Sequence, residues 1–176
     1  TINNNGNGIF LTSPSNNNLI KFNMVHNNVL GGIHLISSPF NNIIFNIANN
    51  NNNGIILSSD SNSNTLSSNT FSCNEREGFL ISNSNSNTID ANMISNNLRQ
   101  GMFLESSSFN NITSNLVDNN DHGDIRLLFS SDNLIYNNIF NNTKKPHVIQ
   151  GNNNWNTTLT SGTNIIGGYP WEEMHG

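Results

Sequence analysis

The side chains best suited to chemistry in this sequence are ionisable residues that recur at one position of a repeating pattern. Seven residues after each of a series of regularly spaced asparagines come Leu30, Asn53, Arg76, Arg99, His122 and Lys144. If successive units stack on one another, the last four form a column of basic groups. The acidic residues beside this column are Glu75, Glu77, Asp121 and Asp124. Glu75 and Asp121 would lie two units apart, which corresponds to about 9.6 Å at the spacing of paired strands. That distance exceeds the usual carboxylate separation in an inverting glycosidase.

The candidates for acid–base catalysis are Glu75, Asp121 and His122. Because the two carboxylates would lie so far apart, the sequence favours a protein without a catalytic site. Binding is the better use of the basic column. Guanidinium groups contact carboxylates in a bidentate manner, so an acidic polysaccharide would fit Arg76, Arg99, His122 and Lys144. A solvated turn that carries mixed charge is the simpler interpretation of the same residues.

The sequence predicts no metal site and no cofactor. The histidines fall at different positions of the pattern, at His26, His34, His122, His147 and His175. Met24 and Met93 share a position but are three units apart, whereas a copper site needs clustered soft ligands. A single cysteine, Cys73, excludes an internal disulfide and a four-thiolate zinc site. It replaces an asparagine of the pattern, and we expect a buried, unreactive thiol.

Composition excludes several classes of protein. Of 176 residues, 43 are Asn, 34% are hydrophobic and 10% are charged. Asn is a poor helix former, so a helical bundle is excluded, and the regular spacing of Ile, Leu and Phe argues against disorder. With 6 Lys and Arg against 11 Asp and Glu, nucleic acid is not an expected partner. No run is long enough for a membrane helix, and the start at Thr1 suggests a mature or trimmed segment.

The sequence repeats with a period of about 23 residues, and this repeat determines the expected fold. One asparagine recurs at Asn23, Asn46, Asn69, Asn92, Asn115 and Asn137. Later in each unit a Gly begins alternating apolar residues, as in Gly32-Ile33-His34-Leu35. Short alternating stretches separated by Asn, Ser and Gly are typical of strands joined by turns. Without a helix between them, they predict the coils of a solenoid.

Stacking of the coils predicts which side chains lie inside. Each strand pairs with its equivalent in the next coil, so the Ile and Leu columns form the core. The six asparagines are expected to form a ladder of side-chain amides along one turn. In the sixth unit, this spacing places Leu134 and Ile139 in the core and Asn138 on the outside.

Two columns of outward side chains predict a contact surface. One reads Phe10, His34, Ile56, Leu80, Phe103 and Arg126, and the other reads Met24, Ile47, Thr70, Met93, Leu116 and Asn138. Contiguous apolar patches usually mark contact sites, so the apolar members are candidates for self-association. The open strand edges at the end of the solenoid are a second route to association between copies. The alternatives are side-chain directions shifted by one residue, or a tail that covers one column.

The pattern N-x-I-x-x-N-x-I-x-N-N followed by G-I-x-L resembles the right-handed parallel β-helix repeats of the carbohydrate-binding and sugar-hydrolysis group. This group includes the NosD-type periplasmic proteins and Asn-rich surface proteins of methanogenic archaea. The resemblance covers residues 1–143, and the segment from Asn154 to Gly168 is similar to the closing segment of archaeal members. It implies a fold rather than a function, because one fold hosts many functions. The dense Lys, Arg and Asp constellation of a pectate lyase is missing from this sequence.

We predict an all-β protein, a right-handed single-stranded parallel β-helix of about seven coils of about 23 residues. Residues 1–143 form the repeats, and residues 144–176 form an irregular final coil and a C-terminal cap or partner-contacting tail. The leading functional hypothesis is a non-catalytic extracellular or cell-surface structural module, whose partners are copies of itself in a layer, sheath or filament. The alternatives are a carbohydrate-binding module with a polysaccharide partner, a glycan hydrolase or lyase, and an ice-binding surface, which lacks a regular Thr column.

Overall fold

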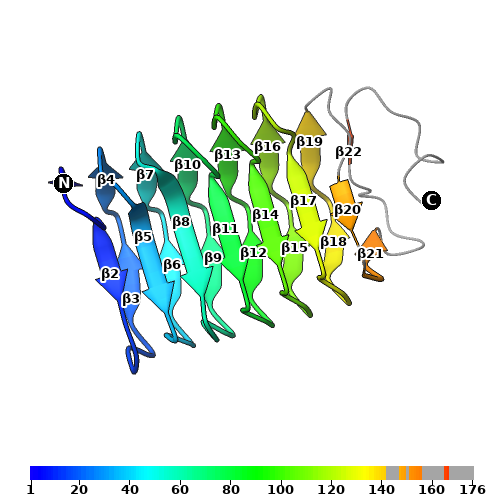
Figure 1. Cartoon of the computed structure of the whole chain (residues 1–176), viewed down its shortest axis with the longest axis horizontal. Coiled ribbons are helices and arrows are strands. Elements are labelled where there is room, and N and C mark those ends of the chain that lie inside the picture. Colours follow the sequence, from blue (N-terminus) through cyan, green and yellow to red (C-terminus); the bar gives the residue numbers. More distant parts are fainter. Residues whose placement is uncertain (142–146, 150, 156–164, 167–176) are drawn as a thin grey trace.

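The computed structural model describes residues 1–141, 147–149, 151–155 and 165–166. Three parallel sheets run along the length of the molecule, and each coil of the chain contributes one strand to each sheet (Figure 1). The strands nearer the viewer run downward and those behind run upward while the coils advance from left to right, so the solenoid is right-handed. The predicted parallel β-helix is confirmed. None of the described residues belongs to a helix long and apolar enough to cross a membrane.

The strands are two to six residues long and are separated by tight corners. Sheet A contains β1 (Ile2–Asn3), β4 (Met24–His26), β7 (Ile47–Asn49), β10 (Thr70–Ser72), β13 (Met93–Ser95), β16 (Leu116–Asp118), β19 (Ile139–Asn141) and β22 (Ile165–Ile166). Sheet B contains β2 (Ile9–Leu11), β5 (Gly31–Ile36), β8 (Asn53–Ser58), β11 (Phe79–Ser82), β14 (Met102–Glu105), β17 (Ile125–Leu128) and β20 (His147–Ile149). Sheet C contains β3 (Leu19–Lys21), β6 (Asn42–Ile44), β9 (Thr65–Ser67), β12 (Thr88–Asp90), β15 (Asn111–Thr113), β18 (Leu134–Tyr136) and β21 (Asn154–Trp155).

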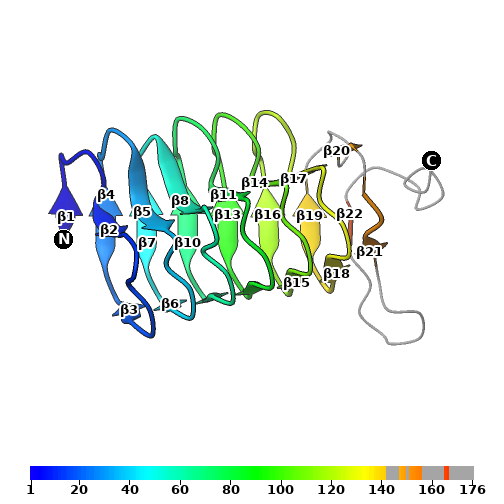
Figure 2. The ribbon, with the colours of Figure 1, turned by 60° about the horizontal axis from the view of Figure 1, so that its bottom comes forward.

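Each strand pairs in register with its equivalent in the neighbouring coils, so identical positions stack along the rod. Phe71 of β10, for example, pairs with Ala48 of β7 and Ile94 of β13. The strands of sheet A lie side by side along the whole rod (Figure 2). Because side chains alternate across a strand, one apolar position per strand in sheets A and C, and two in sheet B, point inward and form the buried core.

Each coil has four corners, and each corner is built from two consecutive residues that play the same two roles. The first adopts a left-handed backbone, such as Asn27 with φ 56° or Ser37 with φ 48°. The second turns its polar side chain into the solenoid and bonds to the same position of the next coil. Asn and Ser suit both places, because they tolerate left-handed backbone and carry short hydrogen-bonding groups. This explains why a quarter of the chain can be Asn in an ordered protein.

The inward corner residues form four ladders. The C–A ladder, between sheets C and A, consists of Asn23, Asn46, Asn69, Asn92, Asn115 and Asn138. The A–B ladder consists of Asn5, Asn28, Asn51, Asn74, Asn97 and Asn120. The B–C ladder consists of Asn18, Asn41, Asn64, Asn87, Asn110, Asn133 and Asn153. The serine ladder consists of Ser38, Ser61, Ser84, Ser107 and Ser130.

From the sequence, the last member of the C–A ladder was placed one residue too early. Asn115 donates its backbone N–H to Oδ1 of Asn138, whereas Asn137 takes the left-handed corner position with φ 57°. The 23-residue period therefore continues unchanged through the sixth coil. As a consequence, Ile135 and Phe140 are buried in place of Leu134 and Ile139, and Asn138 is buried rather than outward.

Glycines allow the coil to pass close to the A–B ladder. A Cβ added to Gly54 would lie 2.4 Å from the carbonyl oxygen of Gly78 and 3.0 Å from the amide nitrogen of Asn74. Gly8, Gly32, Gly78 and Gly101 have similarly close neighbours. In the next coil this column continues at Asp124, whose carbonyl lies against Gly101.

Removal of one ladder amide should destabilise the rod. Asn92 accepts bonds from the backbone N–H and Nδ2 of Asn69 and donates to Leu66 O at 2.9 Å and to Asn115. Asn92→Ala would leave several buried groups without partners, and we expect a loss of about 3–5 kcal/mol in the free energy of unfolding by urea. Asn42→Ala, on the exposed side of β6, should change it by less than about 0.5 kcal/mol. Equal losses in the two variants would contradict a stabilising role for the ladder.

Candidate functional site

The basic column predicted from the sequence lies in the turn between sheets A and B. Arg99 donates its backbone N–H to Arg76 O at 3.2 Å, and His122 donates to Arg99 O at 3.2 Å. These three residues therefore occupy equivalent places in successive coils. All three are exposed. Lys144, the fourth predicted member, lies outside the described residues.

A buried carboxylate lies beneath the two arginines, and its importance was missed in the sequence. Glu77 is only 1% exposed, and its Oε2 accepts a hydrogen bond from Asn53 Nδ2 at 2.8 Å. Arg76 Nε lies 3.6 Å from Oε2, and Arg99 Nη1 lies 3.8 Å from Oε1. Glu77 thus forms ion pairs with both guanidinium groups, whose side chains remain 46% and 48% exposed.

A sequence signal for Glu77 exists in the position before the inward glycine. That position carries a polar side chain in four coils: Asn7, Asn53, Glu77 and Gln100. The last three are buried. Their spacing predicts a polar column beside the basic one, and Glu77 supplies its only charge in these coils.

The candidate catalytic carboxylates lie on an open surface. Glu75 and Asp121 donate their backbone N–H groups to Asn51 and Asn97 of the A–B ladder, two coils apart as predicted. Leu98 holds the same place in the coil between them and is 56% exposed. Both carboxylates are exposed. An exposed apolar side chain therefore separates the two groups.

The outward column of sheet B is formed as the sequence predicted. Phe10, His34, Ile56, Leu80, Phe103 and Arg126 are paired in register from β2 to β17. Phe10 is 51% exposed, and the others are half-buried. The Phe10 and His34 ring centroids are 5.4 Å apart, and Arg126 lies over the Phe103 ring at 5.0 Å. The column therefore has an aromatic pair at one end and a cation–π pair at the other, with aliphatic side chains between them.

His34 is the titratable group of this column. Its Nε2 lies 3.3 Å from Ser58 Oγ, whereas its buried Nδ1 has no hydrogen-bond partner. Burial disfavours the charged imidazolium and lowers the pKa of His34 below 6.5. The neutral ring is the form that fits between Phe10 and Ile56.

The outward column of sheet A is more exposed than that of sheet B. Its members are Met24, Ile47, Thr70, Met93, Leu116 and Ile139, which are paired in register. The apolar members are 39% to 50% exposed. Ile139 takes the place that the spacing of the repeats gave to Asn138, so the column is more apolar than predicted.

Cys73 is exposed, which corrects the prediction of a buried thiol. It takes the left-handed corner position, with φ 54°, and this position points away from the core. Within the described part of the chain, no three His, Cys, Asp or Glu side chains lie close enough to hold a metal ion. Met24 and Met93 are three strands apart in sheet A.

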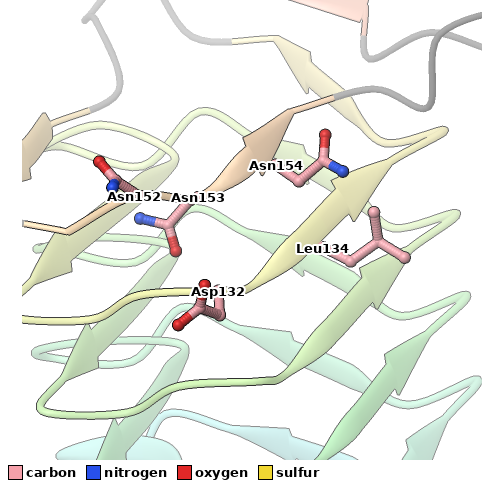
Figure 3. A pocket seen from close by; sticks show the side chains of 5 residues that line it. All are labelled: Asp132, Leu134, Asn152, Asn153 and Asn154. Atoms are coloured by element: carbon pink, nitrogen blue, oxygen red, sulfur yellow. The ribbon is translucent and has the colours of Figure 1, made fainter.

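One hollow of about 500 Å³ lies beside the last coils (Figure 3). It is lined by Asp132, Leu134, Asn152, Asn153 and Asn154. Asn153 closes the B–C ladder by accepting bonds from Asn133, and Asp132 donates its backbone N–H to Asn152 O at 2.6 Å. The Asn153 amide and the backbone groups beside this hollow therefore take part in the stacking of the coils.

The family described as "Periplasmic copper-binding protein (NosD)" matches residues 1–171. Among solved structures, the periplasmic alginate epimerase AlgG (T265N mutant) has 24% identity and a TM-score of 0.72, over 78% of this chain and 34% of that one. The mannuronan C-5 epimerase AlgE4 A-module of Azotobacter vinelandii has 13% identity and a TM-score of 0.64, over 84% and 50%. The AlgE6 A-module has 14% identity and a TM-score of 0.58, over 84% and 56%. No curated protein matches.

These likenesses to solved structures show the fold alone, and this chain spans between a third and about half of each epimerase. The resemblance to surface proteins of methanogenic archaea stays a prediction, because none of these matches tests it.

The low pKa of His34 should make stability depend on pH. The folded pKa lies below the ordinary value of 6.5, so the unfolded chain binds the proton first as the pH falls. The contribution of neutral His34 is complete above 6.5 and is lost as the pH falls from 6.5 through the folded pKa. Urea midpoints measured from about pH 8 to about pH 5 should therefore decrease less in His34→Gln than in the parent chain. Parallel profiles would contradict this role.

Proposed function

The chain belongs to the family described as periplasmic copper-binding protein (NosD), and we propose that it is a non-catalytic module of the cell envelope that binds an extended polysaccharide along the outside of its solenoid. This membership confirms the resemblance seen in the sequence. The family and the AlgG epimerase are both described as periplasmic, which supports a location in the envelope at a coarse level.

The observation that carries the proposal is the pair of guanidinium groups fixed one coil apart. Glu77 engages one edge of Arg76 and Arg99, and about half of each side chain faces solvent. The remaining N–H donors can bond to hydroxyl or carboxylate groups of a sugar. Equivalent positions repeat about every 4.8 Å along the axis, so a polymer lying along the rod meets both arginines.

The charges of the turn define how this site would bind. Arg76 and Arg99 share it with the carboxylates of Glu75, Glu77 and Asp121, so the described turn carries no positive excess. Binding would therefore depend on directed hydrogen bonds more than on attraction of a polyanion. The open positions of Glu75 and Asp121 support binding without catalysis, since neither carboxylate is enclosed beside the other.

The described residues do not fit the copper named in the family description. Copper sites cluster imidazole, thiolate or thioether ligands, whereas no such group of His, Cys and acidic residues occurs in the described ranges. Met24, Met93 and exposed Cys73 lie in different coils. The proposal therefore assigns no role to copper.

Self-association is a second candidate, favoured by the exposed apolar column of sheet A. Its partner would be another copy, as the sequence suggested. The outer face of sheet A is about 10 Å wide and about 35 Å long, or roughly 350 Å². A stable interface buries about 800 Å² on each partner, so this face alone supports only weak association. Association through the ends of the solenoid stays a prediction.

The polysaccharide site can be tested by affinity electrophoresis in gels that contain mannuronan or a neutral β-mannan. Arg76→Ala combined with Arg99→Ala should weaken retardation about tenfold, because two charge-assisted contacts are lost. Arg126→Ala removes a cation outside the turn and serves as the control. If the gel retards the double variant and the control as strongly as the parent, the proposal is removed. It is also removed if the parent forms unsaturated or reducing-end product.

Self-association can be tested separately by sedimentation velocity across a concentration series. Leu116→Lys places a charge in the sheet A column and should shift any oligomer to monomer. Leu98→Lys alters a more exposed leucine in the A–B turn and should leave the distribution unchanged. If both variants sediment as the parent does, the sheet A column is not an interface.

A further inference from the structure

Five exposed phenylalanines occupy corner positions that folding does not require to be aromatic. Phe22, Phe40, Phe45, Phe109 and Phe129 all have left-handed backbone, with φ between 50° and 60°. They are 51% to 72% exposed. A bulky side chain in this conformation is unusual and costs energy. Other coils place Asn, Ser, Asp or Ala at the same corners, so the rings are not needed for the solenoid.

Two of these rings stand in successive coils and form a pair. Phe22 and Phe45 lie at the corner between sheets C and A, with ring centroids 5.4 Å apart and planes inclined by 10°. Parallel rings at this centroid distance are offset rather than eclipsed, so each ring covers only part of its neighbour's face. Phe22 is 72% exposed and Phe45 51%. Lys21 Nζ lies 5.8 Å from the Phe22 centroid.

The pair ends abruptly along the corner. The next three coils carry Ser68, Ala91 and Ser114, so the aromatic surface is two rings long. Met24 and Ile47 extend it onto the outer face of sheet A. This aromatic corner (Lys21, Phe22, Phe45) is too small for a stable protein interface, which buries about 800 Å² on each side.

We propose that the aromatic corner is a stacking subsite for a linear polysaccharide, an inference that rests on the proposed function and adds a place of contact outside the arginine turn. The C–H faces of pyranose rings are apolar and pack against phenyl rings. The spacing of Phe22 and Phe45 is close to the length of one sugar residue, so a chain along the axis places neighbouring sugars on neighbouring rings. Lys21 donates hydrogen bonds to hydroxyl or carboxylate groups at the edge of the sugar.

The ligand class follows from this combination of rings and charge. A single ammonium beside two open aromatic faces suits a polyhydroxylated chain that has both apolar faces and polar edges. A membrane surface would need a wider apolar and basic area. Membrane binding is therefore the competing outcome of the test.

The test replaces both rings with the residue found at this corner in other coils. Phe22→Ser combined with Phe45→Ser should keep the urea midpoint, since Ser68 and Ser114 already occupy equivalent positions. We expect Kd for mannuronan and for neutral β-mannan, measured by titration calorimetry, to rise about tenfold. Phe109→Ser combined with Phe129→Ser removes two exposed rings of the same backbone class that have no stacked partner, and it should bind as the parent does. Lys21→Gln should weaken mannuronan more than β-mannan.

The outcomes separate this inference from the proposed function. If Phe22→Ser with Phe45→Ser binds both polysaccharides as the parent does while Arg76→Ala with Arg99→Ala does not, the aromatic corner is not a subsite and the proposed function stands. If the parent binds neither polysaccharide, both fall. If the parent instead sediments with anionic phosphatidylserine vesicles and the Phe22→Ser with Phe45→Ser variant does not, the corner is a membrane contact and the subsite is overturned.

Discussion

The side-chain amide bond between successive coils is the interaction on which this structure depends. In a middle coil, an inward Asn such as Asn92 accepts at Oδ1 from the coil before it and donates its backbone N–H and Nδ2 to the coil after it. Its Nδ2 also donates to a backbone carbonyl of the coil before it. Polar groups that would be costly to bury are thereby satisfied at every corner. With the corners fixed, short strands suffice, and a chain with only 34% hydrophobic residues forms a continuous core.

This division between a uniform interior and a variable exterior explains where function can reside. Inward columns repeat Asn, Ser, Gly and aliphatic residues, because each side chain must match those above and below it. Outward positions and left-handed corners carry no such demand. Arg76 and Arg99 in one turn, and Phe22 and Phe45 in another, are local choices added to a scaffold that does not change around them. Such a protein can acquire or lose contact sites by single substitutions.

Most of the fold could be predicted from the sequence, because stacking makes the period directly visible. The C–A ladder and the outward columns were located correctly through five coils. In the sixth coil, Asn137 and Asn138 are adjacent, and the chemical pattern cannot tell a corner Asn from a ladder Asn; backbone conformation decides. Cys73 was assigned to the interior because cysteines are usually buried, although its column of asparagines pointed to a corner. Glu77 was placed beside the basic column, but its burial was not predicted, because acidic residues next to arginines resemble a solvated turn.

The repetition of the ladders has a consequence for the length of the protein. Each middle coil makes the same kinds of bonds to the coil before it and to the coil after it, so a whole coil can be inserted or deleted without altering any interior bond type. Coil number is thus open to change by tandem duplication, in steps of about 4.8 Å. The arginine turn and the aromatic corner lie in different coils, so each coil inserted between them would lengthen their separation along the axis by one such step. Hydrogen bonding sets the spacing of the coils, and the number of repeats between two surface features sets how far apart those features lie along the axis.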